Sequence, residues 1–127
     1  MNSSAPFDLV LRTRSFALRI IKLYAALPKT TEVQVLGKQI LRSGTSVGAH
    51  YREAKRSRST AEFVSKIEGG LQELEETQYW LELLMESGIV RRELLTDICE
   101  EANELTSILV ASAKTAKTKK QFIIQRS

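Results

Sequence analysis

Apolar side chains recur every three or four residues along most of the chain, which is the spacing of one face of an α-helix. The first stripe covers residues 9–27 and is followed by Pro28, which ends the predicted helix. The second covers residues 33–54, and Thr30 or Thr31 can cap its start with a side-chain oxygen. The pattern therefore predicts two long helices joined by a short turn.

Two further helical stripes follow in the second half of the chain. Between residues 63 and 84, the inner positions are spaced by alternating steps of four and three residues, the spacing of the seam of a coiled-coil-like bundle helix. Ser59 and Glu62 form a capping box before this helix. The Ser-Gly pair at 87–88 can end this helix, and residues 95–112 carry the fourth stripe. No segment alternates with period two. We therefore predict an all-α fold, an up-down-up-down antiparallel four-helix bundle, because short loops favour contact between consecutive helices.

The apolar stripe is lost toward the C-terminus. From Lys114 onward the chain is rich in Ala, Lys and Thr, which predicts a frayed helix end followed by a mobile tail. We divide the chain into a four-helix bundle over residues 1–115 and a basic C-terminal tail over residues 116–127. Three adjacent apolar residues at 122–124 could dock on a neighbouring subunit or a partner.

The composition is typical of a single globular domain. The chain has 127 residues, of which 43% are apolar and 27% charged, enough for a real core. A single cysteine excludes an intrachain disulfide and is usual in the reducing cytoplasm. The N-terminus lacks the pattern of a signal peptide, and no run of about 18 uncharged apolar residues occurs. We expect a cytoplasmic protein that does not span a membrane.

Charge is strongly segregated along the chain, although the net charge is only +4. Residues 1–66 hold twelve Lys/Arg against four Asp/Glu, whereas residues 67–104 hold two against eleven. Residues 105–127 hold five basic residues and no acidic one. Such segregation can attract a polyanion to one face, or it can let copies of the chain dock on each other.

Few side chains in the sequence are suited to catalysis or to metal binding. His50 is the only histidine, and no second metal ligand lies at helical spacing from it. Cys99 is the only cysteine, and its neighbours Asp97 and Glu100 would raise rather than lower the pKa of its thiol. The glutamates at 68–86 mostly fall off the apolar seam, and neither a Glu-x-x-His pair nor a glycine-rich phosphate loop occurs. We therefore expect no enzyme, no metal and no cofactor.

Small side chains gather in two helical segments, at residues 43–49 and at Gly69-Gly70. Glycine inside a helix costs about 1 kcal/mol relative to alanine, so another interaction must offset it. Close packing of a neighbouring helix is the favoured interpretation, and contact with a ligand is the alternative.

Basic residues flank the small segment of the second helix and continue on the first. Because consecutive helices are usually adjacent, they predict one broad basic surface that binds phosphate backbones. The candidate nucleic-acid-binding residues are Arg12, Arg19, Lys22, Lys38, Arg42, Arg52, Lys55 and Arg56.

Several separated motifs resemble those of one known family. They are Ser43-Gly44-Thr45-Ser46-Val47-Gly48-Ala49-His50-Tyr51-Arg52-Glu53-Ala54, Ala61-Glu62-Phe63, Glu73-Leu74-Glu75-Glu76-Thr77-Gln78-Tyr79-Trp80-Leu81-Glu82-Leu83-Leu84 and Ser87-Gly88-Ile89-Val90. Between about Leu18 and Leu109, the chain resembles the bacterial four-helix bundle proteins encoded by intervening sequences of 23S ribosomal RNA genes.

This resemblance implies a four-helix bundle protomer, assembly into a homopentameric ring and no known enzymatic activity. Related proteins include the accessory variability determinant of diversity-generating retroelements, a basic pentamer that associates with a reverse transcriptase and with nucleic acid. By that resemblance the eight basic residues would contact nucleic acid, and a reverse transcriptase or another protein is a further candidate partner. The acidic second half departs from an all-round basic barrel and favours a ring in which basic and acidic faces meet.

Together, these patterns predict a non-enzymatic homo-oligomeric protein that contacts the backbone of RNA or DNA through its first two helices. Two alternatives remain open. In one, the charged faces serve ring assembly or a protein partner. In the other, His50 takes part in catalysis.

Overall fold

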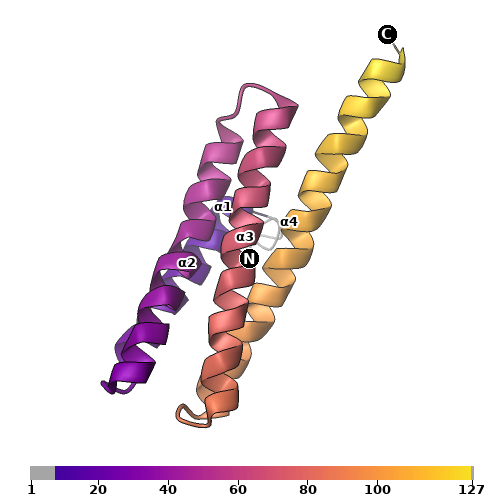
Figure 1. Ribbon diagram of the computed structural model, residues 1–127. Helices are drawn as coiled ribbons and strands as arrows, with labels where there is room; N and C mark the ends of the chain where they lie inside the picture. The colour runs from indigo at the N-terminus through magenta and orange to yellow at the C-terminus, as the bar shows by residue number, and fades with distance from the viewer. Residues whose placement is uncertain (1–7, 127) are drawn as a thin grey trace, which may run out of the picture.

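Four α-helices make up the part of the chain that the computed structural model describes, residues 8–126, with side chains described as far as Lys119. They are α1 (Leu9–Ala26), α2 (Thr31–Lys55), α3 (Thr60–Ser87) and α4 (Arg92–Arg126) (Figure 1). No strand occurs within these residues. The predicted all-α, four-helix fold is confirmed.

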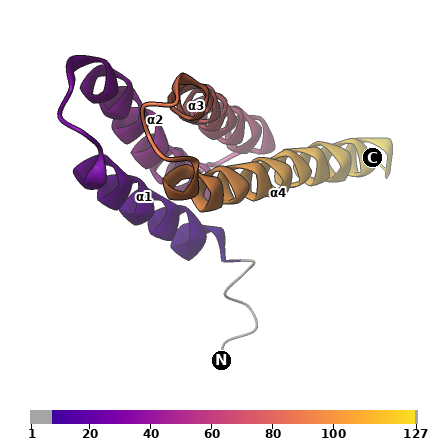
Figure 2. The same cartoon turned by 90° about the horizontal axis from the view of Figure 1, so that it is seen from below.

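The helices pack in a ring-like order around one core. α2 contacts α1 and α3, and α4 contacts α3 and, over a shorter stretch, α1. α1 and α3 occupy opposite corners when the molecule is seen from below (Figure 2). Glu53 contacts Lys66 at 2.9 Å and Arg42 contacts Glu76 at 2.6 Å, so α2 and α3 run in opposite directions.

The predicted apolar stripes form the core. On α3, Ile67, Gly70, Leu74, Thr77, Leu81 and Leu84 are buried, as the alternating spacing requires. Facing them from α4 are Leu95, Leu105 and Leu109, each at most 1% exposed. Each large apolar side chain buried in this way stabilises the fold by about 1.5–3 kcal/mol.

The small side chains of α2 let both neighbouring helices approach closely. A Cβ added to Gly44 would lie 2.8 Å from Cγ1 of Ile20 on α1. On the other side, the hydroxyls of Ser43 and Thr77 share a buried hydrogen bond of 2.7 Å between α2 and α3. The interpretation of the small segment as a site of close helix packing is therefore confirmed.

The helix ends follow local rules. The side-chain oxygen of Ser59 accepts a hydrogen bond from the backbone N–H of Glu62, which caps α3 as predicted. α3 ends at Gly88, whose φ of 72° is a left-handed conformation that glycine adopts without a steric penalty. Within the described residues, no helix is long and apolar enough to cross a bilayer.

α4 differs from the expectation of a frayed end near Lys114. It continues as a helix to Arg126 and extends beyond the other three helices (Figure 1). Residues 89–127 contain no proline or glycine, and the good helix formers Ala, Lys and Gln support the helix without an apolar stripe. The division at residue 115 stays a prediction, and the side chains at 122–124 lie outside those described.

Replacing Gly44 with alanine is expected to destabilise the fold by about 1–3 kcal/mol, although alanine is favoured over glycine within a helix by roughly 1 kcal/mol. The new Cβ would press on Ile20, which is fully buried and packed on all sides. Urea unfolding followed by circular dichroism measures the change.

Gly70→Ala is the matched control, because Gly70 is also a buried glycine within a helix. Its added Cβ would lie 3.5 Å from Cβ of His50, an ordinary contact, so this variant should be neutral or more stable. Equal losses of stability in the two variants would contradict the packing argument.

Candidate nucleic-acid interface

The outer surface of α2 carries the most accessible of the candidate cations. Lys38, Arg52, Lys55 and Arg56 are exposed, and none of them makes an ion pair with any described residue. Lys38, Arg52 and Arg56 lie on one side of the helix at helical spacing. Arg52 and Lys55 are in the last turn, where the partial negative charge of the helix end favours cations. These four cations, the α2 cation group, are free to meet an external anion.

The candidate cations of α1 lie on another side of the molecule. Arg19 and Lys22 are exposed and line a shallow groove between α1 and α4, of about 250 Å³, opposite Asp97. The acidic start of α4 therefore faces them. The structure does not bring this pair together with the α2 cation group on one surface.

Arg12 links α1 to α4. Its Nε donates to Oε2 of Glu101 at 2.9 Å, and its Nη2 donates to Oε1 of Glu101 at 3.0 Å and to Glu104 at 3.1 Å. The side chains of Arg12 and Glu101 are only 19% and 15% exposed. The hydrogen bond from Arg12 lowers the pKa of Glu101, and the same bond raises the pKa of Arg12. Arg12 thus carries structural ion pairs, and its contact with nucleic acid stays a prediction.

Arg42 is similarly engaged, between α2 and α3. Its guanidinium contacts Glu76 at 2.6 Å and Glu73 at 3.3 Å. Two carboxylates therefore neutralise this candidate within the chain, although half of its side chain is exposed. Its role at a nucleic-acid interface also stays a prediction.

Sequence reasoning missed three exposed apolar residues on α1, Leu11, Leu18 and Ile21. They lie outside the buried stripe and interrupt the basic surface that the first two helices were expected to share. The signal was present in the sequence, because these residues do not fit the positions of the inner face. An exposed apolar group of this kind is typical of a protein contact rather than of a phosphate contact.

The groups considered for catalysis lie apart. His50 packs over Gly69, and its Nδ1 is buried without a hydrogen-bond partner among the described residues. Cys99 is half-buried, and burial together with the nearby Glu82 raises the pKa of its thiol. In the described part of the chain, no three His, Cys, Asp or Glu side chains gather as a metal site would require.

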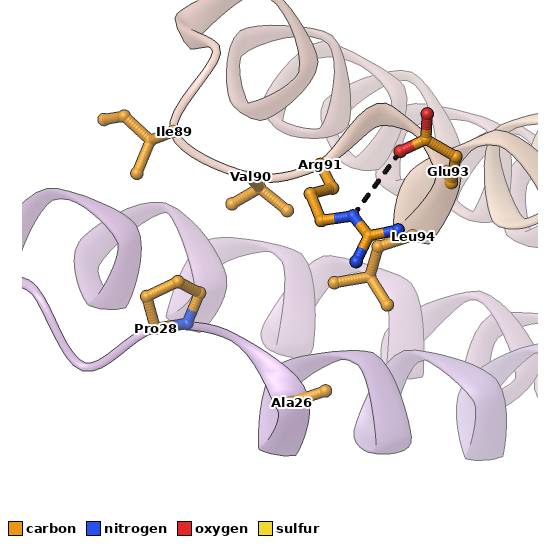
Figure 3. A pocket seen from close by; sticks show the side chains of 7 residues that line it. All are labelled: Ala26, Pro28, Ile89, Val90, Arg91, Glu93 and Leu94. Atoms are coloured by element: carbon orange, nitrogen blue, oxygen red, sulfur yellow. Dashed lines mark ion pairs between the residues drawn. The ribbon is translucent and has the colours of Figure 1, made fainter.

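A larger pocket of about 540 Å³ opens at the end of the bundle, between the α1–α2 turn and the α3–α4 loop. Ala26, Pro28, Ile89, Val90 and Leu94 give it a mostly apolar lining (Figure 3). At its edge, Nε of Arg91 lies 3.7 Å from a carboxylate oxygen of Glu93. The lining offers contacts for an apolar group.

Comparison with known proteins identifies the family. A family model described as 23S rRNA-intervening sequence protein matches residues 7–111. The chain belongs to this family. The resemblance seen in the separated motifs is thereby confirmed.

A protein of known structure shares the fold. Its crystal structure is described as that of a protein with unknown function from the S23 ribosomal protein family of Bacteroides thetaiotaomicron. That protein is 40% identical to this chain, with a TM-score of 0.78, and the match covers 84% of this chain and 98% of the other. A search of curated proteins gave no match.

The ion pair between Arg12 and Glu101 gives a prediction for this family member. Arg12→Ala should lower the free energy of unfolding by about 1–2 kcal/mol at neutral pH, because it leaves a half-buried carboxylate unpaired. Arg14→Ala, two residues further along α1 at an exposed position, should change it by at most about 0.5 kcal/mol. Urea unfolding at pH 7 compares the two.

The same pair predicts a pH dependence. The folded pKa of Glu101 is lowered, so its contribution is present above the ordinary glutamate pKa of about 4.3 and is lost as the pH falls through the lowered value. The stability difference between the wild type and Arg12→Ala should therefore shrink on acidification below about pH 4.3. A difference that is constant with pH would contradict this assignment.

Proposed function

We propose that this family member is a non-enzymatic, homo-oligomeric, cytoplasmic protein that contacts the backbone of RNA or DNA. The observation that supports the proposal is the α2 cation group, four exposed basic side chains without an intrachain ion pair. Free cations bind phosphates by releasing condensed counterions, so the contact depends on salt and little on sequence.

The α2 cation group carries this role better than the full set of eight. Arg12 and Arg42 already contact two carboxylates each. Arg19 and Lys22 lie across α1, near the acidic start of α4. The proposed surface is therefore narrower than the sequence suggests, and it centres on the C-terminal half of α2.

The second part of the proposal is assembly. Up-down-up-down bundles would join in a homopentameric ring, as the family resemblance implies. The exposed apolar residues of α1 support self-association, because a chain that acted alone would leave them in water. A protein-interaction scaffold, with a reverse transcriptase or another protein as partner, is the second candidate function and draws on the same observation.

Fluorescence anisotropy with a labelled RNA hairpin at 50, 100 and 200 mM NaCl tests the nucleic-acid contact. With about four phosphate contacts, the plot of log affinity against log salt should have a slope of about −3 to −4. Arg52→Glu with Arg56→Glu should reduce the magnitude of the slope by about 2 and weaken binding at low salt by more than about tenfold.

Arg91→Glu with Arg92→Glu is the matched control. It makes the same change in net charge at two exposed positions, Arg91 in the α3–α4 connection and Arg92 at the start of α4, at the far end of the bundle. The control should weaken binding only slightly. No binding at 50 mM salt, affinity that is indifferent to salt, or equal losses in the two variants would overturn the proposal.

A further inference from the structure

The outer side of α1 has the pattern of a docking surface. Leu11, Leu18 and Ile21 are 49%, 52% and 47% exposed, and their spacing of seven and three residues places them on one side of the helix. Arg14 and Lys22 flank them, and both are exposed and make no ion pair with the described residues. These five residues are the α1 face. An apolar centre with a charged edge is the usual form of a protein interface.

The outer side of α3 has the complementary pattern. Tyr79 is 54% exposed. Glu75 lies four residues before it, and Glu82 and Glu86 lie three and seven residues after it, so all four share one side of the helix. All three glutamates are exposed and form no ion pair within the described chain. These four residues are the α3 ridge. An aromatic side chain with a polar tip is well suited to a partly polar interface.

We propose that the α1 face of one copy of this chain docks on the α3 ridge of a second copy. Tyr79 would pack on Leu18 and Ile21, and the glutamates of the ridge would meet Arg14 and Lys22. This is the side-chain arrangement of two helices that pair through an apolar seam with opposite charges on its edges. The inference rests on the self-association in the proposed function and names the surfaces that perform it.

The fold determines how such contacts propagate. α1 and α3 lie at opposite corners of the bundle and do not contact each other in the described residues (Figure 2). The two surfaces therefore cannot meet within one copy, and each copy offers one of each. A contact between unlike surfaces gives a ring when the rotation closes. The α2 cation group is part of neither surface, although its Arg52 lines a groove between α1 and α2 together with Arg14 of the α1 face.

Multi-angle light scattering over a range of concentrations tests the inference on the full chain. The wild type should exceed the protomer mass of 14.3 kDa several-fold. Leu18→Gln with Ile21→Gln should return the protein to the protomer mass, and so should Tyr79→Gln with Glu82→Lys. Val35→Gln on α2, where the side chain is 57% exposed and outside both surfaces, should keep the wild-type mass.

Mixing the two disrupted variants separates this contact from a symmetric one. In an equimolar mixture, the intact ridge of the α1-face variant can still accept the intact face of the α3-ridge variant. A species of twice the protomer mass should form, although each variant alone is monomeric. Pairing of like surfaces, α1 face on α1 face or α3 ridge on α3 ridge, would give no such mixed species. Circular dichroism of each variant checks that its helices are intact.

The outcomes are distinguishable. A wild type that stays at the protomer mass at every concentration would overturn self-association and this inference together, and would assign the two surfaces to another protein. Variants that keep the wild-type mass, or a mixture that stays monomeric, would overturn the surfaces named here and leave self-association standing. Hairpin binding by the α1-face variant reports on the α2 cation group separately.

Discussion

The fold depends on the close approach of α2 to the helices on both sides of it. Gly44 leaves room for Ile20 of α1, while Ser43 shares its hydroxyl hydrogen bond with Thr77 of α3. The two contacts lie within one turn of α2, so neither neighbour can shift outward without losing packing against the same segment. The ion pairs between α2 and α3, Arg42 with Glu76 and Lys66 with Glu53, form across the same helix contact.

The same packing determines which charges remain available. Because α2 and α3 lie close together, Arg42 can reach Glu73 and Glu76, and because α4 approaches α1, Arg12 can reach Glu101. The cations at these helix contacts, Arg12 and Arg42, form ion pairs within the chain. Cations on the outward sides, such as Lys38 and Arg56 of α2 and Arg14 of α1, are exposed and make no ion pair with the described residues.

Much of the fold was predictable from residue spacing. The apolar stripes identified the helices and most of the core, the cap at Ser59 was correct, and the Ser-Gly pair at 87–88 marked the end of α3. The candidate site was less predictable, because charge counts do not say which carboxylate lies across a helix contact. Arg12 contacts Glu101, which lies 89 residues further along the chain. This contact becomes evident only once the packing of α4 on α1 is known. The continuation of α4 was missed because it depends on helix propensity instead of on an apolar stripe.

Because the helices have unequal lengths, the two ends of the bundle differ in shape. α4 has 35 residues and α1 has 18, so at about 1.5 Å per residue α4 is longer by roughly 25 Å. α4 reaches past the other helices at one end of the bundle (Figure 1), and its C-terminal part carries the exposed Lys114 and Lys119. A ring whose rotation axis runs parallel to the helices would repeat the overhang around one rim and leave the other rim without it. Its two faces would then differ in shape and charge, and a ligand threading or capping the assembly would distinguish its entrance from its exit.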